Sequence, residues 1–390
     1  MNKFNFCSPT HVYFGENSIE NLPEAINQVK ENAKLLLVYG GGSIKRLGIY
    51  DKFLELCKNN GNEVIEMGGV EPNPRVQSVE KGVELVKEHG IDIICGIGGG
   101  SAIDAAKAIA LARYYEGNAW DIVVKPSLSP KAMPIIAIPT LSATGTETDN
   151  FSVISNPETN EKIGIGDNRI RPAIAIMDPT YTYSVNKYHT GAGTADIFSH
   201  IFEGYFNVNK GAFVKKRINE ALLKTVIKYG PIALEKPDDY EARSNLMWAA
   251  SLAINGETFL GNHTASWSCH PLEHILSGYY DITHGAGLAV LTPAWMKFCL
   301  KEEYAVDDFA EYGVNVWGID ASLDKMEIAN IAIEKTKEFL TSLGMPTCLK
   351  DTGIPDDTKL KEMADHVGNL NIAYVKMTPE DILNIYKSCY

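Results

Sequence analysis

Two pairs of side chains at helical spacing could together hold a metal ion. Asp196 and His200 are four residues apart, as are His270 and His274, and His284 follows soon afterwards. Residues four apart on a helix project from the same face, so each pair could converge on one ion. One carboxylate and three imidazoles can bind a divalent metal and leave a coordination position for substrate. The sequence therefore predicts an open metal centre.

These residues also admit simpler interpretations. A single histidine is more often a packed or surface residue than a ligand, and chance could supply one such pair among nine histidines. Two pairs with a third histidine close behind favour the metal, and spacing favours Asp196 over the nearby Glu203 and Glu273. The predicted ligands are Asp196, His200, His270 and His284. His274 is predicted to be an outer-sphere or proton-shuttling group, with a hydrogen-bonded structural histidine as the alternative.

A run of glycines further upstream could bind a phosphate. Gly98-Gly99-Gly100-Ser101 follows an apolar strand and opens an Ala-rich helix, with Asp104 in its first turn. Glycine lets the backbone approach a phosphate closely, and the N–H groups at a helix start attract anions. The spacing differs from the GxGxxG fingerprint, so a tight turn without a ligand is the alternative. A nucleotide cofactor together with an open metal predicts hydride transfer at a carbonyl.

A second glycine run bears on the choice of nicotinamide cofactor. Another apolar strand ends in the residues Gly40, Gly41, Gly42 and Ser43. Chains that prefer NAD usually place an acidic residue at such a position, where it meets the ribose hydroxyl. Small residues with Lys45 and Arg46 close behind would instead accommodate the extra phosphate of NADP(H), which we favour over NAD(H). A surface turn with solvated cations is the alternative.

The chain changes character near its middle. Short apolar strands are predicted at residues 34–39, 63–67, 91–97, 133–138 and 173–177, with helices at 50–59, 76–89 and 101–115. This alternation predicts a parallel sheet covered by helices on both faces. Further helices are predicted at 192–206, 213–229, 239–255, 327–343 and 379–389. We expect a nucleotide-binding α/β domain at 1–183 and an all-helical metal-binding domain at 184–390, with an active site that uses both.

Composition narrows the class of protein. The 390 residues carry a net charge of −13 with no basic cluster, which argues against nucleic acid as a partner. No run of residues is long and apolar enough to span a membrane, and the N-terminus lacks the apolar core of a signal peptide. The seven cysteines form no CxxC pair, and their odd number excludes complete internal pairing. We expect a reduced, cytoplasmic protein.

Taken in order, these motifs resemble the iron-containing alcohol dehydrogenase family, in particular its butanol dehydrogenase-like branch. The resemblance covers nearly the whole chain, and its most specific part is Asp196-x-x-x-His200 with His270-Pro271-Leu272-Glu273-His274 and Tyr280-Asp281-Ile282-Thr283-His284-Gly285. The supporting motifs are Phe4-Asn5-Phe6 with Phe14-Gly15, Tyr39-Gly40-Gly41-Gly42-Ser43, Gly69-Val70-Glu71-Pro72-Asn73-Pro74, Gly98-Gly99-Gly100-Ser101-x-x-Asp104, Pro139-Thr140-x-x-Ala143-Thr144-Gly145-Thr146-Glu147 and Asp178-Pro179. The segments 143–151 and 188–193 depart from the usual family pattern, but neither contains a predicted ligand.

The resemblance implies a role for each matching residue. The four predicted ligands would bind Fe2+ or Zn2+, and His274 matches the family histidine beside the metal. The cofactor would be bound by two sets of residues. The glycine loops and their neighbours would supply Gly40, Gly41, Gly42, Ser43, Asn73, Gly98, Gly99, Gly100, Ser101 and Asp104. The cofactor and nicotinamide region would be lined by Thr140, Leu141, Thr146, Asp149 and Lys162. The implied fold is a Rossmann-like sheet domain, shared with dehydroquinate synthase, followed by an all-α domain.

The expected function is reversible reduction of a small aldehyde to a primary alcohol, such as butyraldehyde to butanol, with NAD(P)H. The resemblance also implies a homodimer paired through the N-terminal segment, although an internal edge strand is the alternative. A lyase resembling dehydroquinate synthase would need a cluster of cationic residues that the helical half lacks near the ligands. A metal-dependent hydrolase, or a non-catalytic nucleotide sensor, would also fit the separate motifs.

Overall fold

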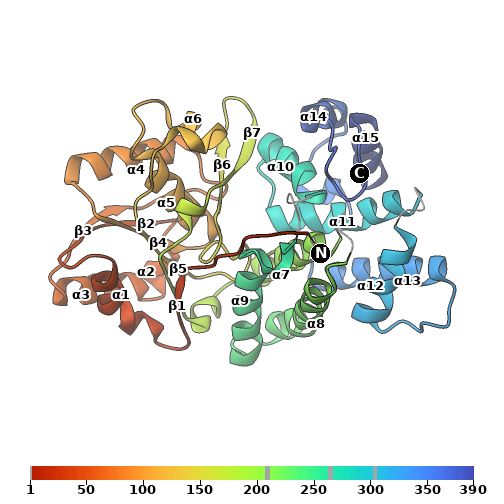
Figure 1. Cartoon of the computed structure of the whole chain (residues 1–390), viewed down its shortest axis with the longest axis horizontal. Helices are drawn as coiled ribbons and strands as arrows, with labels where there is room; N and C mark the ends of the chain where they lie inside the picture. Colours follow the sequence, from red (N-terminus) through yellow and green to blue (C-terminus); the bar gives the residue numbers. More distant parts are fainter. Residues whose placement is uncertain (1, 207–210, 262–266, 302–304) are drawn as a thin grey trace. The chain divides into compact units, whose positions relative to one another are not determined.

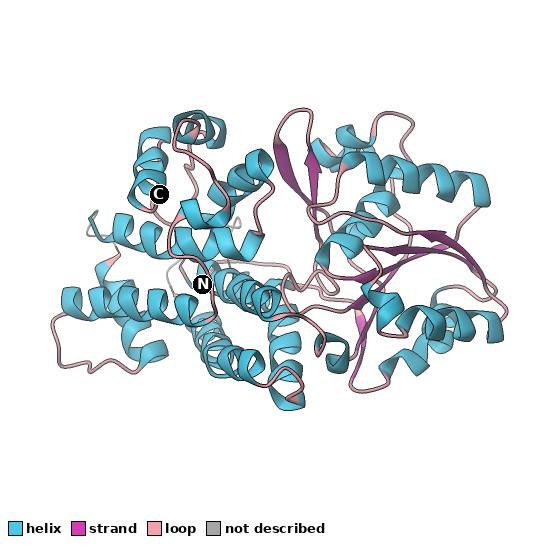
Figure 2. Ribbon diagram, turned by 180° about the vertical axis from the view of Figure 1, so that it is seen from behind, coloured by secondary structure: helices cyan, strands magenta, loops and turns pink. Residues whose placement is uncertain are grey.

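A computed structural model describes residues 2–206, 211–261, 267–301 and 305–390. The chain divides into two compact units. One is Cys7–Val185, and the other is Asn186–Tyr390 together with the N-terminal residues up to Phe6. The N-terminal residues therefore group with the helical unit, whereas the expected division at 183 and 184 had placed them in the sheet domain. In the described residues every strand lies in the first unit, as the magenta arrows of Figure 2 show.

The first unit is built on a six-stranded sheet in the order β1-β8-β5-β4-β2-β3, and every neighbouring pair is parallel. Its strands are β1 (His11–Phe14), β2 (Lys34–Tyr39), β3 (Glu63–Met67), β4 (Ile93–Gly98), β5 (Ile135–Pro139) and β8 (Ile174–Met177). Parallel strands need crossovers, and the α-helices of this unit are α1 (Leu22–Val29), α2 (Ser43–Arg46), α3 (Ile49–Asn59), α4 (Val76–His89), α5 (Gly100–Ala112) and α6 (Ala119–Val124) (Figure 1).

The side chains of β2 alternate between two separate hydrophobic cores, one on each face of the sheet. Leu35 and Leu37 pack into one cluster with residues of α1 and α3, whereas Leu36 and Val38 pack into another with residues of α4 and α5. Successive side chains of a strand point to opposite faces, so a continuous apolar run is needed where both faces are covered. The sheet is therefore buried on both sides, and the ends of β2 and β4 lead directly into the glycine runs.

Two features of this unit were not predicted. An antiparallel hairpin of β6 (Phe151–Asn156) and β7 (Glu161–Gly166) stands apart from the main sheet, and β1 forms an edge of that sheet beside β8. Short 3₁₀ helices complete the unit at Ser18–Asn21, Pro126–Leu128, Asn168–Ile170 and Pro179–Thr182. The hairpin matters because β6 contacts α5, the helix that begins at the second glycine run.

The second unit is helical. Its α-helices are α7 (Lys187–Tyr205), α8 (Phe213–Glu235), α9 (Tyr240–Ile254), α10 (Cys269–Tyr280), α11 (His284–Lys301), α12 (Val306–Trp317), α13 (Lys325–Ser342), α14 (Leu360–Val367) and α15 (Pro379–Ser388), with 3₁₀ helices at Glu257–Phe259 and Leu349–Thr352. None of the helices in the described residues is long and apolar enough to cross a membrane. The predicted fold class, a parallel α/β domain followed by an all-α domain, is confirmed.

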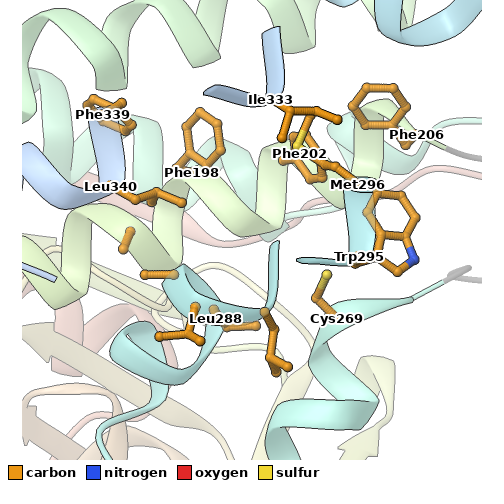
Figure 3. Close-up of a cluster of buried hydrophobic side chains, with 14 of the residues drawn as sticks. Phe198, Phe202, Phe206, Cys269, Leu288, Trp295, Met296, Ile333, Phe339 and Leu340 are labelled. Atoms are coloured by element: carbon orange, nitrogen blue, oxygen red, sulfur yellow. The ribbon is translucent and has the colours of Figure 1, made fainter. Parts of the chain in front are cut away.

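The helical unit is centred on α7. Its residues from Thr190 to Tyr205 are all buried, so this helix is enclosed on every side. Phe198 and Phe202 of α7, together with Phe206 directly after the helix, form an aromatic row that packs against Trp295 of α11 and Phe339 of α13 (Figure 3). Residues four apart share a helix face, so this row fixes how α7 is rotated about its axis.

Helices α7 and α11 approach so closely that only glycine fits at one contact. A Cβ atom at Gly285 would overlap the backbone of Ala192. Gly285 immediately follows His284, and Ala192 lies one turn before Asp196. The distance between two predicted metal ligands therefore depends on a residue with no side chain.

We expect Gly285→Ala to destabilise the protein by about 1–3 kcal/mol, because an added methyl group must push the two backbones apart. The free energy of unfolding in urea measures this loss. Gly164→Ala in β7 is the matched control, because its Cβ would lie an ordinary 4.0 Å from the Val153 side chain. Wild-type stability of Gly285→Ala would contradict the close packing of α7 against α11.

Candidate active site

Three helices of the second unit bring the predicted ligands together. An oxygen of Asp196, a ring nitrogen of His270 and a ring nitrogen of His284 all lie within 4.8 Å of one another. These residues come from α7, α10 and α11 respectively. The Oδ1 atom of Asp196 lies 3.5 Å from Nε2 of His284 and 3.7 Å from Nε2 of His200. The carboxylate is thus surrounded by three imidazoles, two of them far away in the sequence.

His200 completes the group from the same face of α7 as Asp196. Its ring stacks on that of His270, with centroids 4.8 Å apart and an interplanar angle of 18°. Burial lowers the pKa of His200 to about 3 and outweighs the opposing effect of the Asp196 carboxylate. The imidazole is therefore neutral at physiological pH, which is the form that can bind a metal ion.

Several polar atoms at this point have no hydrogen-bond partner among the described residues. They are Asp196 Oδ1, His200 Nδ1 and His270 Nε2, and all three are buried. A buried polar atom left without a partner costs about 1–3 kcal/mol. A divalent cation bound between Asp196 and His270 would satisfy two of these three atoms, while His200 presents its other ring nitrogen, Nε2, to Asp196. The residues present therefore fit Fe2+ or Zn2+, since both accept nitrogen and oxygen ligands.

Two further carboxylates orient the ligands from outside. Glu203 Oε1 lies 2.6 Å from Nδ1 of His270, and Glu273 is hydrogen-bonded to Nδ1 of His284. In each ring this contact engages one nitrogen and leaves Nε2 for the centre. Burial lowers the pKa of His270, but the Glu203 carboxylate outweighs burial and the pKa is raised. Glu203 therefore contacts His270 rather than standing in for Asp196, whereas Glu273 also forms a second group with His274 and His284 whose ligand atoms lie within 4.8 Å of one another.

His274 and Trp267 border the centre. The His274 ring lies 5.4 Å from that of His284 and 6.0 Å from that of His270, and the side chain is half-buried. The ring of Trp267 lies 4.6 Å from His270 and 5.9 Å from His200. His274 can therefore exchange protons beside the ligands, while Trp267 provides an apolar wall.

The second glycine run adopts the geometry of a strand-to-helix turn. Strand β4 ends at Gly98, whose φ of 148° disfavours other residues, and α5 begins at Gly100. A Cβ at Gly100 would lie 2.8 Å from Oγ1 of Thr144, so the segment after β5 covers this turn closely. The backbone N–H of Thr140 donates to the Gly98 carbonyl at 2.8 Å. Thr140 and Leu141 thus border the glycine run, as expected for residues that share a ligand.

Behind this turn lies a buried ionic network that the sequence analysis did not identify as such. Lys107 is fully buried, and its ammonium donates to Oδ1 of Asp149 at 2.6 Å and to Oγ1 of Thr146 at 2.8 Å. Thr146 in turn donates to Asp104 at 2.6 Å. Burial raises the pKa of Asp104 to about 6, although Lys107 opposes the shift. Asp104, Thr146 and Asp149, which the sequence analysis predicts to bind the cofactor, therefore form a network with Lys107 that holds the covering segment onto α5.

Lys107 could have been recognised by its context. It is a lysine within an Ala-rich helix that is apolar on every other side, three residues after Asp104. A charged side chain that is fully buried needs a partner of opposite charge, and for Lys107 the carboxylates of Asp104 and Asp149 provide it. No such signal indicated Glu203 or Glu273 as orienting groups, because their partners depend on tertiary packing.

The first glycine run shows a different environment. Gly42 has a φ of 99° and precedes α2, and Asn73 has a φ of 51°. The Lys45 ammonium lies over the rings of Tyr50 and Tyr39, at 4.4 and 5.3 Å from their centroids. Ser43 follows the turn directly. The remaining predicted cofactor residue, Lys162, is buried in β7.

Comparison with known proteins matches both halves of the chain. Residues 9–179 match the iron-containing alcohol dehydrogenase family, and residues 190–390 match the C-terminal part of that family. The chain is 52% identical to NADH-dependent butanol dehydrogenase A of Clostridium acetobutylicum, over the full length of both. It is 35% identical to NADPH-dependent aldehyde reductase YqhD of Escherichia coli, over 94% of each.

A solved structure agrees with these relatives. The crystal structure of NADH-dependent butanol dehydrogenase A from Thermotoga maritima superposes with a TM-score of 0.94 and 37% identity, covering 100% of this chain and 99% of that one. The chain therefore belongs to the iron-containing alcohol dehydrogenase family, within its butanol dehydrogenase-like branch. The predicted family and enzyme class, an alcohol dehydrogenase, are confirmed. The lyase and hydrolase alternatives are not favoured by any of these matches.

We expect His270→Ala to abolish metal binding, because it removes a ligand together with the ring that Glu203 contacts. The loss of affinity should exceed the roughly 10- to 100-fold typical of an outer-sphere change. Metal analysis of the purified protein measures this, while NADPH titration should show nucleotide binding intact, since the glycine runs lie in the other unit. His366→Ala, at an exposed histidine, is the matched control. Full metal content and turnover in His270→Ala would disprove the ligand assignment.

Proposed function

We propose that the chain is a metal-dependent alcohol dehydrogenase and aldehyde reductase that uses NAD(P)(H) and acts on small primary alcohols and aldehydes, such as butanol and butyraldehyde. The observation that carries this proposal is the convergence of Asp196, His270 and His284, whose ligand atoms lie within 4.8 Å of one another, with Nε2 of His200 3.7 Å from the same Asp196 oxygen. Among the described residues, Asp196 Oδ1 and His270 Nε2 have no hydrogen-bond partner. The relatives named butanol dehydrogenase and aldehyde reductase support the substrate class.

The division of labour follows from the two units. The helical unit would hold Fe2+ or Zn2+ through the four ligands, and the sheet unit would hold the dinucleotide at its glycine runs. When bound, these groups supply a Lewis acid that polarises the carbonyl oxygen and a nicotinamide that exchanges hydride. The protein's own side chains position these groups. Asp196 supplies the one carboxylate among the ligands, and Trp267 shields the histidines from water.

His274 is the group we propose for proton transfer. It lies beside two ligands without belonging to the unsatisfied set, and its side chain is half-buried, so it has access to water. In aldehyde reduction its imidazole would deliver a proton to the product oxygen, directly or through water. In alcohol oxidation it would accept that proton.

We also propose that NADP(H) is preferred over NAD(H). Residues 40–50, which directly follow β2, include no acidic residue, and the turn offers Gly42 and Ser43 with the exposed Lys45 ammonium nearby. On β3, the strand paired with β2, the carboxylate of Glu66 accepts hydrogen bonds from the hydroxyls of Tyr39 and Tyr50 at 3.2 and 2.8 Å. These relatives are divided, because the butanol dehydrogenases A and B are named as NADH-dependent and YqhD as NADPH-dependent.

A homodimer in a reducing, cytoplasmic setting completes the proposal. None of the seven cysteines forms a disulfide. The side chains of Phe4, Phe6 and Phe14, at the N-terminal end and on β1, are exposed, and β1 is an edge strand. An edge strand beside exposed aromatic residues can pair with a second copy of itself. Sedimentation of the purified protein would distinguish a dimer from a monomer.

The proposed activity predicts steady loss of nicotinamide absorbance when metal-loaded protein is mixed with NADPH and butyraldehyde. The value of kcat/KM should be higher with NADPH than with NADH, because the extra phosphate meets Ser43 and Lys45 rather than a carboxylate. Protein stripped of metal serves as the control and should be inactive until Fe2+ or Zn2+ is restored. A flat trace with metal-loaded, folded protein would contradict the proposed function, and a preference for NADH would contradict only the cofactor choice.

His274→Ala should give a folded protein with full metal content and a kcat lowered by about 10²- to 10⁴-fold, the usual contribution of a positioned acid or base. The dependence of kcat on pH should also change, because one titrating group has been removed. His366→Ala again provides the control. A pH–rate profile identical to that of the wild type would remove the proton-transfer role.

A further inference from the structure

Glu203 makes contacts that exceed those of a simple partner for one histidine. It lies on α7, three residues after His200, and its side chain is 1% exposed. One carboxylate oxygen, Oε2, accepts hydrogen bonds from the backbone N–H groups of Ser268 and Cys269, the latter at 3.0 Å. The other, Oε1, accepts from the backbone N–H of His270 at 3.1 Å and lies 2.6 Å from its Nδ1.

These three backbone groups are the start of α10. The first N–H groups of a helix have no partner within the helix and need acceptors from elsewhere. Ser268 occupies the N-cap position of α10 but its side chain makes no capping hydrogen bond. Glu203 takes over that function from a different helix, and its negative charge is favourable at the positive end of the helix dipole.

The same carboxylate sets the state of the His270 ring. Since Oε1 can only accept, Nδ1 carries the hydrogen, and in the neutral ring, which is the form that binds a metal ion, Nε2 then holds the lone pair. Nε2 is buried and has no hydrogen-bond partner among the described residues. One side chain thus fixes the backbone that carries His270, the rotation of its ring and its tautomer.

We propose that Glu203 is a positioning residue that preorganises the metal centre by tying the start of α10 and the His270 ring to α7. This inference rests on the ligand set proposed above. It goes beyond that set because it assigns to a residue outside the ligands the task of holding two ligand-bearing helices in register.

The chemistry of the two orienting carboxylates differs in a way that can be tested. Both oxygens of Glu203 face N–H groups, so a glutamine would place its NH2 against N–H donors in either orientation of the amide. At Glu273 one oxygen accepts from the hydroxyl of Ser277, and a hydroxyl can also accept. A glutamine at 273 can therefore keep a hydrogen bond to His284 and reverse the one to Ser277.

The experiment compares Glu203→Gln with Glu273→Gln and Glu220→Gln in the full chain. Glu220 is another buried glutamate of the helical unit, bonded to Tyr205 and Asn315 and remote from the ligands. Affinity for Co2+ and Zn2+ is measured on metal-depleted protein, together with the visible absorption of the Co2+ form. Glu203→Gln should bind metal about 10- to 100-fold more weakly, with an altered Co2+ spectrum. Glu273→Gln should lose less affinity, and Glu220→Gln should lose none, even if it is less stable.

Each outcome has a defined meaning. Wild-type metal affinity and an unchanged Co2+ spectrum in Glu203→Gln would overturn the inference. Equal losses in the glutamine variants at 203 and 220 would also overturn it, by showing a general effect of removing a buried charge. If Glu203→Gln does not fold, Glu203→Asp provides the test, because it keeps two accepting oxygens. It should retain part of the metal affinity and of the wild-type Co2+ spectrum. A folded Glu203→Asp protein that retains neither would count against the inference. Absence of metal binding by the wild type would instead defeat the ligand proposal itself.

Discussion

The helical unit is organised around a buried carboxylate oxygen that has no hydrogen-bond donor among the described residues. An ionised group removed from water is costly unless an opposite charge compensates it. Asp196 is 3% exposed, and in the described part of the chain one nitrogen of His200 and one of His270 are also without a hydrogen-bond partner. His200, whose pKa burial lowers, is neutral and cannot neutralise the carboxylate, so the arrangement makes physical sense as a site for a cation. The total enclosure of α7, the glycine contact with α11 and the outer carboxylates all follow from the need to bring these groups to one point.

The sheet unit must hold a glycine-rich turn in place, and it also does so with buried side chains outside the turn. A phosphate-binding turn needs a backbone that stays in place although it is rich in glycine, the residue that loses most freedom on folding. The structure supplies rigidity from outside the turn. Thr144 covers Gly100, and Lys107 ties the covering segment to α5 through Asp149 and Thr146. In both units a buried carboxylate supports a predicted binding site without being one of the groups proposed to contact the ligand.

The sequence predicted what local patterns can encode. Strands β2 and β3 and helix α4 were placed at their observed bounds, because continuous apolar runs and a regular apolar stripe are strong signals. The β6–β7 hairpin was missed because the buried positions of β6 include Ser152 and Asn156, so its alternation is not one of apolar and polar residues. Helix α11 gave no periodic signal, since it is apolar on nearly every side and contains Pro293.

The candidate site shows the same limit. The spacing of Asp196 and His200 predicts a shared helix face, and the structure places them so. His284 is predicted as a ligand because it follows the His270 and His274 pair closely, and the family resemblance implies the same residue. No local pattern, however, indicates that it meets Asp196 in space. The partners of Glu203 and Lys107 arise from contacts between segments 39 to 67 residues apart, which no spacing rule reaches.

The aromatic row of α7 carries a consequence for how this protein can diverge. Phe198, Phe202 and Phe206 lie on one side of the helix and the ligands lie on another, so any adjustment of the packing is transmitted as a rotation of the coordinating groups. Interiors are packed densely enough to pass on such shifts. Substitutions of these aromatic residues that conserve volume would be harmless in most cores. Here they are constrained because they would shift the predicted metal ligands. Evolutionary drift should be slowest along this helix, at positions that never contact a substrate.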